Sequence, residues 1–295
     1  MPRAIDVHVH PSTFEFVNDA LGEYAPACEA YFRTELPRTS VQEMADEFRR
    51  VDILGVLFAW DAETATGLPP VTNDFVARCV RDHPDAFLGF ASVDPWKGDA
   101  AIVELERSVR DLGLRGLKLH PTAQAFRPDS RRLAPLWETA AAFGIPVTVH
   151  TGTTGLGAGM PGGGKMKLAW SRPLYLDGVA SDFPELQIVM AHPAWPWQDE
   201  QLAIALHKPN TWIDLSGWSP RRFAPELVRE IKGALQDRVL FGTDYPFLRH
   251  EQWLSAFGEL GLSDEITEKV LLRNAERLLG LSTDAYGEPL DSRLG

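Results

Sequence analysis

The chain has 295 residues, of which 44% are hydrophobic and 24% are charged, a composition typical of a folded globular protein. Asp and Glu outnumber Lys and Arg by 41 to 29, which gives a formal net charge of −12, and the basic residues form no cluster. Proteins that bind the phosphate backbone of nucleic acids need such a cluster, so this class of function is excluded.

The two cysteines, Cys28 and Cys79, form no CxxC motif, which argues against a thiolate metal site or a disulfide framework. The first residues show no apolar core of a signal peptide, and no apolar run approaches the length needed to cross a membrane. We therefore expect a cytoplasmic protein without a membrane partner.

Eight short runs of β-branched and apolar residues predict strands, at residues 5–10, 53–59, 88–93, 114–120, 146–151, 187–192, 211–216 and 239–243. Between them lie segments with helical periodicity. The first starts at Ser40, with Glu43 three residues later, which is a capping box. Helices are predicted at residues 40–50, 73–83, 99–112, 129–143, 172–182, 197–207, 225–235, 252–260 and 264–279. The tail after Leu281 is expected to be loosely ordered.

This alternation of strands and helices predicts an α/β protein in which helices cover a parallel sheet. Eight repeats favour a closed (β/α)8 barrel, the TIM barrel, over an open doubly wound sheet. No linker interrupts the pattern, so residues 1–295 are expected to form a single domain. Residues 12–39 and the glycine-rich residues 152–170 are long segments after predicted strands, and we expect them to be loops that cover the barrel mouth.

His8 and His10 lie two residues apart on the first predicted strand, so both imidazoles point to the same face and could hold one metal ion. Taken alone, they could equally be polar residues on a half-exposed strand. His120, His150, His192 and Asp244 also stand at the ends of predicted strands, where barrel enzymes place their active-site residues. Imidazole and carboxylate groups are the ligands expected for zinc or a similar divalent ion.

The motifs IDVHVHP, GLKLHP, VTVHTG, IVMAHPAW, LFGTDYPF and LLRNAERLLGL, spread over residues 5–281, are similar to those of the amidohydrolase superfamily. Within it, they resemble the branch that holds aminocarboxymuconate-semialdehyde decarboxylase-like and resorcylate decarboxylase-like enzymes. The resemblance implies that His8, His10, His150 and Asp244 hold one divalent metal, most often zinc, with manganese or magnesium as alternatives. It also implies that His192 is the acid/base and that Asp244 takes part in catalysis as well as in ligation. Homodimers are common in this branch, with a neighbour's arginine reaching the site.

Lys118 and His120 share one face of the predicted fourth strand. Binuclear members of the superfamily carry a carbamylated, metal-bridging lysine at the end of this strand. For Lys118 we instead expect a buried amine paired with a carboxylate. His120 is predicted to contact the substrate. Further substrate contacts are predicted for Trp195 and Trp218, as walls for a flat substrate. Arg172 is predicted as an anchor for a carboxylate, with Arg221 and Arg222 as alternatives near the same rim.

These features favour a metal-dependent, non-oxidative decarboxylase, a C–C lyase, that acts on an aromatic or unsaturated carboxylic acid. A hydrolase of a lactone, ester or amide would use the same residues and remains an alternative. A non-catalytic barrel that binds a metal or a small molecule is the second alternative.

Overall fold

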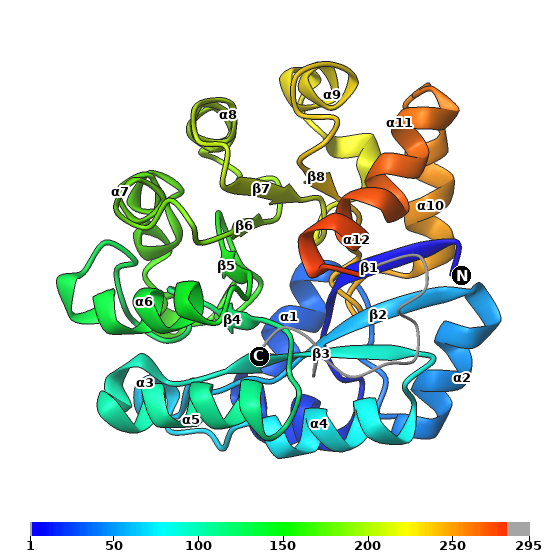
Figure 1. The fold of residues 1–295 in the computed structure, drawn as a ribbon. Coiled ribbons are helices and arrows are strands. Elements are labelled where there is room, and N and C mark those ends of the chain that lie inside the picture. The colour runs from blue at the N-terminus through cyan, green and yellow to red at the C-terminus, as the bar shows by residue number, and fades with distance from the viewer. Residues whose placement is uncertain (1, 282–295) are drawn as a thin grey trace.

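The computed structural model describes residues 2–281, which form a ring of parallel strands surrounded by helices (Figure 1). The eight strands pair in chain order, from β1 to β8. They are β1 (Ala4–Val9), β2 (Ile53–Phe58), β3 (Phe87–Ser92), β4 (Leu117–Leu119), β5 (Val147–His150), β6 (Ile188–Ala191), β7 (Thr211–Asp214) and β8 (Val239–Leu240). This architecture confirms the predicted TIM barrel. The ends of each strand differ from the predicted ends by at most a few residues.

Backbone contacts between β1 and the residues after β8 close the ring. The Val7 amide donates to the Phe241 carbonyl (3.0 Å), and the His10 amide donates to the Tyr245 carbonyl (2.7 Å). In the other direction, the Asp244 amide donates to the His8 carbonyl (3.1 Å). Closure therefore places the Asp244 carboxylate, which follows β8, beside His8 and His10, although more than 230 residues separate them in the chain.

The helices follow the predicted positions closely. They are α2 (Val41–Val51), α4 (Asn73–Asp82), α5 (Asp99–Arg110), α6 (Ala134–Ala142), α7 (Leu174–Asp182), α8 (Gln198–His207), α9 (Pro225–Lys232), α10 (His250–Gly258), α11 (Asp264–Glu268) and α12 (Asn274–Leu279), with a short additional helix α3 (Glu63–Thr66). The capping box of α2 is present: the Ser40 hydroxyl accepts from the Glu43 amide (3.2 Å) and the Glu43 carboxylate accepts from the Ser40 amide (2.8 Å).

The prediction that residues 12–39 are a loop is wrong for most of that segment. It contains a π-helical turn, Glu15–Ala20, a 3-10 turn, Gly22–Tyr24, and helix α1 (Ala25–Phe32). Phe16, Val17, Ala20 and Cys28 on these turns are buried, so packing rather than strong local propensity stabilises them. The segment is thus a packed helical cover and not an open loop.

Residues 152–171 contain short 3-10 turns and irregular backbone. Gly162, Gly163 and Gly164 all have positive φ, a run of left-handed backbone that other residues adopt only at a cost. The Tyr24 hydroxyl donates to the Gly164 carbonyl (3.2 Å), so the two long segments predicted to cover the barrel contact each other.

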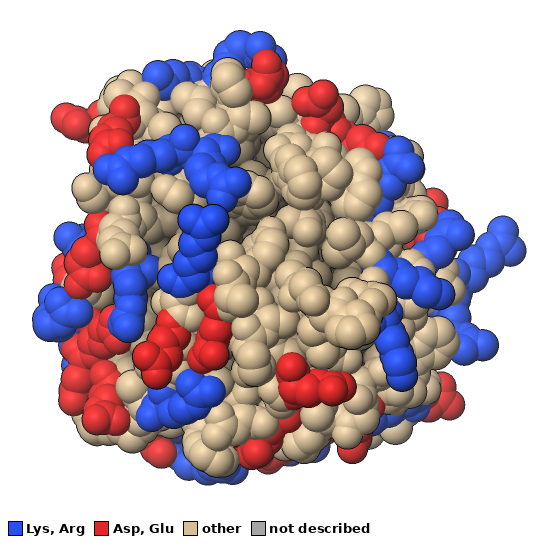
Figure 2. Space-filling view, turned by 180° about the vertical axis from the view of Figure 1, so that it is seen from behind, with Lys and Arg blue, Asp and Glu red and all other residues tan. Residues whose placement is uncertain are grey.

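In the space-filling view from behind, the middle of the surface is mostly uncharged, with charged residues gathered toward its edges (Figure 2). No helix in residues 2–281 is long and apolar enough to cross a membrane. Cys28 and Cys79 are free and buried. The predicted loose tail after Leu281 lies outside the described residues.

Candidate active site

A cavity opens among the carboxyl ends of the strands, with polar residues and apolar residues both in its lining. The polar ones are His8, His10, Lys118, His120, His150, His192 and Asp244, together with Thr153 and Thr154. The larger apolar and aromatic ones are Phe16, Leu21, Tyr31, Phe32, Trp60, Leu156, Trp218 and Phe247. The ends of β1, β4, β5, β6 and β8 therefore converge on one pocket, as the sequence predicts.

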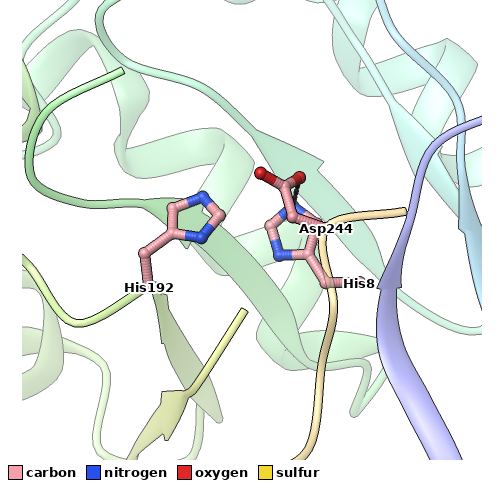
Figure 3. Close-up of side chains that lie close together, drawn as sticks. All are labelled: His8, His192 and Asp244. Carbon is pink, nitrogen blue, oxygen red and sulfur yellow. Dashed lines mark ion pairs between the residues drawn. The ribbon is translucent and has the colours of Figure 1, made fainter. Parts of the chain in front are cut away.

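His8, His192 and Asp244 form a compact group of potential metal ligands, and their side chains point toward one another (Figure 3). One ligand atom from each residue lies within 4.8 Å of the others, and all three residues are buried. His8 Nε2 is 3.4 Å from Asp244 Oδ1. These distances are of the size that a shared cation would bridge.

His10 and His150 adjoin this group. His10 Nε2 is 3.5 Å from Asp244 Oδ1, and His150 Nδ1 is 3.0 Å from His192 Nε2. The other ring nitrogens, His10 Nδ1 and His150 Nε2, are buried without a hydrogen-bond partner. All five residues predicted as ligands or acid/base are thus brought together. The distances alone do not divide them into four ligands and one acid/base, so that division remains a prediction.

Asp214 and Ser216 form a second layer that sequence reasoning missed. His8 Nδ1 lies 2.6 Å from Asp214 Oδ2, and the Ser216 hydroxyl donates to the same oxygen (2.8 Å). Ser216 Oγ also lies 2.9 Å from His8 Nδ1 and from His192 Nδ1. If the His8 Nδ1 proton is donated to Asp214, the lone pair of His8 Nε2 faces the cavity. A signal was available: the two residues stand two apart on β7 and its end, as His8 and His10 do on β1.

The backbone is in an unusual conformation just after β6 and β8, at His192 and Asp244. His192 and Asp244 have φ values of 69° and 66°, a left-handed conformation that is uncommon for residues with a Cβ. Gly217 also has positive φ, and a Cβ there would lie 2.6 Å from His192 Nδ1. Such outliers cluster at functional sites, where the surrounding structure has to hold them.

Asp6 ties the first strand to the last below the histidines. Its Oδ1 accepts from the amides of His8 and Thr243, both at 3.0 Å, and its Oδ2 lies 3.0 Å from His250 Nε2. Asp6 and His250 are fully buried. This carboxylate therefore fixes the register between β1 and the turn that carries Asp244.

Burial controls the protonation of the site. It lowers the pKa of His8, His10, His120 and His150 well below the usual value, and nearby Lys118 or neighbouring histidines add to the shift. Burial also lowers the pKa of His192 to about 4, an effect that Asp214 opposes. The imidazoles are therefore neutral near pH 7, the form in which histidine binds metals.

Asp244 and Lys118 are shifted in opposite directions. Burial raises the pKa of the Asp244 carboxyl, and the charge of Lys118 opposes this shift. Burial lowers the pKa of the Lys118 amine, which Asp244 and Asp214 oppose. Lys118 Nζ lies 3.0 Å from His8 Nε2 and 4.8 Å from the centre of the Phe58 ring. The expected pairing of Lys118 with a carboxylate is absent from residues 2–281, where its hydrogen bond goes to an imidazole instead.

The predicted substrate contacts lie in different places. His120 stacks on His150, with ring centres 3.7 Å apart, and both line the cavity together with Trp218. Trp195 is 50% exposed, with its ring 6.4 Å from that of Trp218, and is not among the lining residues. Arg172 is likewise absent from the lining, and its guanidinium pairs with Glu200 through Nε (2.9 Å). Trp195 and Arg172 as substrate contacts thus remain predictions from the sequence.

Several curated relatives of the chain are decarboxylases. It is 28% identical to the decarboxylase orsB of Emericella nidulans, an alignment that covers 66% of this chain and 70% of that protein. It is 25% identical to the gamma-resorcylate decarboxylase of a Polaromonas species, over 71% and 75% of the two chains. It is 24% identical to the 2-amino-3-carboxymuconate-6-semialdehyde decarboxylase of Dictyostelium discoideum, over 85% and 78%.

Solved structures share the fold over nearly the whole chain. An uncharacterised TIM-barrel protein of Bordetella bronchiseptica is 27% identical, with a TM-score of 0.80 and coverage of 94% of this chain and 98% of that one. A dihydroxybenzoic acid decarboxylase of a Polaromonas species, solved with manganese and the inhibitor 2-nitroresorcinol, is 22% identical with a TM-score of 0.65, covering 95% and 98%. The amidohydrolase family model matches residues 5–281. The chain therefore belongs to the amidohydrolase family.

Proposed function

We propose that this protein is a metal-dependent, non-oxidative decarboxylase of an aromatic or unsaturated carboxylic acid. The observation that carries the proposal is a cavity in which neutral imidazoles and a carboxylate lie beneath aromatic walls. The decarboxylase relatives, aligned over two thirds or more of their length, support the reaction class.

The residues present fit a divalent metal. Buried nitrogens of His10 and His150 lack partners, and Asp214 leaves the His8 Nε2 lone pair directed at the cavity. In the proposal, His8, His10, His150 and Asp244 hold the ion. Zinc is the first expectation from this ligand set, with manganese as an alternative because a related decarboxylase was solved with it. When bound, the ion supplies a Lewis acid that attracts the carboxylate or a neighbouring hydroxyl of the substrate.

His192 is proposed to handle the proton. Decarboxylation breaks the bond between the carboxyl carbon and its neighbour, and a proton must replace carbon dioxide on that neighbour. His192 lines the cavity, and its ring nitrogens lie 2.9 Å from Ser216 Oγ and 3.0 Å from His150 Nδ1, so the imidazole would pass the proton along this hydrogen-bonded chain. Asp244, 6% exposed, orients the reacting group as well as serving as a ligand.

The walls favour a flat substrate. Phe16, Phe32, Trp60 and Trp218 contribute aromatic surface around the polar residues. Planar rings pack well on such surfaces, in stacked or edge-to-face arrangements. His120, stacked on His150, adds a polar contact beside them.

The deciding experiment is metal analysis followed by a substrate screen. Dihydroxybenzoates and muconate-type acids are assayed for carbon dioxide release, and lactones, esters and anilides for hydrolysis. We expect carbon dioxide release that a chelator abolishes and the added metal restores. Turnover of lactones alone would replace the proposal by the hydrolase alternative. No turnover together with tight metal binding would favour a non-catalytic barrel.

The location and the assembly of the protein are proposed as well. Both cysteines are buried and unpaired, which fits a reducing compartment such as the cytoplasm. A homodimer is an expectation from the family resemblance, and sedimentation of the purified protein tests it.

A further inference from the structure

Lys118 is a buried amine without a carboxylate partner in the described chain. It is 1% exposed on β4, its Nζ contacts His8 Nε2 at 3.0 Å, and it lies over the Phe58 ring. Lysine is almost never fully buried unless it is paired with an anion. An anion beside Lys118 is therefore expected when the site is occupied.

The contact with His8 cannot persist when a metal is bound. Asp214 and Ser216 occupy the Nδ1 side of His8, which leaves Nε2 with one lone pair directed into the cavity. Lys118 donates to that lone pair, and a metal ligated by His8 needs the same electrons. Metal binding would thus free the amine inside a buried cavity, where donors without an acceptor cost free energy.

Most polar groups around Lys118 are already engaged. His120 Nδ1 already accepts from the Ala123 amide, both ring nitrogens of His192 have partners, and Asp244 is a proposed ligand. The Asp214 carboxylate already accepts from His8 and Ser216. An acceptor supplied by the bound molecule would satisfy the amine, which can donate hydrogen bonds in either protonation state.

We propose that Lys118 binds the carboxylate of the substrate and selects carboxylic acids over neutral analogues of the same shape. One carboxylate oxygen faces Nζ, in the space between β4 and the residues proposed to hold the metal. The carboxylate as ligand rests on the proposed function, but the role of Lys118 is measurable by binding alone. Among the described residues that line the cavity there is no arginine, so Lys118 is the basic side chain that a carboxylate there could contact.

Calorimetry with the manganese-loaded protein tests the proposal through two inert ligands of matched shape, benzoate and benzamide. In the wild type, benzoate binds more tightly than benzamide. In Lys118→Met, we expect benzoate affinity to fall about 10- to 100-fold, the range for a hydrogen bond to a charged group, and benzamide affinity to change less than about threefold. Lys167→Met is the matched control, because Lys167 is exposed and outside the cavity lining, and both affinities stay unchanged.

A second readout separates binding from a structural role. Because Lys118 competes with the metal for His8 Nε2, Lys118→Met should bind manganese several-fold more tightly than the wild type. A residue that only stabilises the barrel would weaken both metal and benzoate binding when replaced. Tighter manganese binding together with weaker benzoate binding in Lys118→Met therefore supports the proposal.

Three results would overturn it. The first is no benzoate binding to the wild type, and the second is equal benzoate and benzamide selectivity in wild type and Lys118→Met. The third is a wild-type mass increased by one carbon dioxide, together with a second bound metal equivalent, which would identify a carbamylated bridging lysine. If circular dichroism shows that Lys118→Met is unfolded, Lys118→Gln replaces it, and a wild-type crystal structure with benzoate decides whether a carboxylate oxygen contacts Nζ. Retained selectivity without carbon dioxide release from any acid would reject the decarboxylase proposal and leave this one standing.

Discussion

The cavity has a polar floor, made of side chains at the strand ends, and aromatic walls, and the two are built in different ways. The floor consists of His8, His10, Lys118, His120, His150, His192 and Asp244. On the floor, side chains from the strand ends are held by a second layer: Asp214 and Ser216 contact His8, and Asp6 fixes the backbone of His8 and Thr243. Much of the wall comes from the connecting segments, such as Phe16 in the helical cover after β1 and Trp218 after β7.

This difference separates chemistry from substrate choice. The floor depends on the register of neighbouring strands, so its geometry cannot change without disturbing the barrel. The walls depend on connections, which tolerate replacement more readily. We therefore expect floor substitutions to affect metal binding and turnover, and wall substitutions to affect mainly substrate affinity.

The largest effect is expected from removing a proposed ligand. His10→Ala or Asp244→Asn should lower kcat/KM for the identified substrate about 1,000-fold, equivalent to about 4 kcal/mol, and reduce the bound metal. His207→Ala on the exposed surface of α8 is the matched control and should behave as the wild type. Full activity with undiminished metal content in Asp244→Asn would contradict the ligand assignment.

Acid should lower the free energy of unfolding of the metal-free protein through the buried histidines of the floor. The pKa of His192 is about 4 in the fold, below its usual 6.5, so the unfolded chain binds this proton first as the pH falls. Stability is thus retained above about pH 6.5 and lost between about pH 6.5 and 4, by about 3 kcal/mol for this residue. Urea unfolding across this range measures it.

The matched variant for that prediction is His192→Gln, which removes the titrating group. Its free energy of unfolding should fall less steeply with acid than that of the wild type. The four other histidines with lowered pKa continue to contribute in both proteins. Identical slopes in the two proteins would show that His192 is not held in its neutral form.

A smaller effect on the floor is expected from the second layer. Asp214→Asn removes the negative charge that accepts from His8 Nδ1, so His8 is no longer fixed in one tautomer. We expect metal affinity to fall about 10- to 100-fold. Competition with a fluorescent chelator measures this, with Asp237→Asn, whose carboxylate pairs with Lys269 on the surface, as control. Equal affinities in the two variants would rule out the positioning role.

The walls should give the smallest effect. Trp218→Ala, which removes a lining side chain, should raise KM about tenfold with little change in kcat. Trp195→Ala, which replaces a half-exposed side chain outside the lining, should change KM less than twofold. If the two substitutions have equal effects, Trp195 contributes to the substrate site as the sequence suggested, and the wall extends beyond the cavity.

The barrel, the family and the strands that carry or precede His8, His10, His150, His192 and Asp244 were predictable from the sequence. These features are readable because strand alternation and the position of strand ends are local patterns along the chain. The sequence did not reveal the helices over residues 15–32, which depend on burial of Phe16 and Cys28 against distant residues.

The hydrogen-bond partners of the site residues depend on the folded barrel. Barrel closure brings Asp244 beside His8, places Asp214 behind it and directs Lys118 to His8 Nε2, while Arg172 is engaged with Glu200. Hydrogen-bond partners across a barrel are separated by tens to hundreds of residues in the chain, so no local pattern encodes them. The residue types of the site could therefore be predicted from the sequence. Their roles depend on which strands lie side by side in the folded barrel.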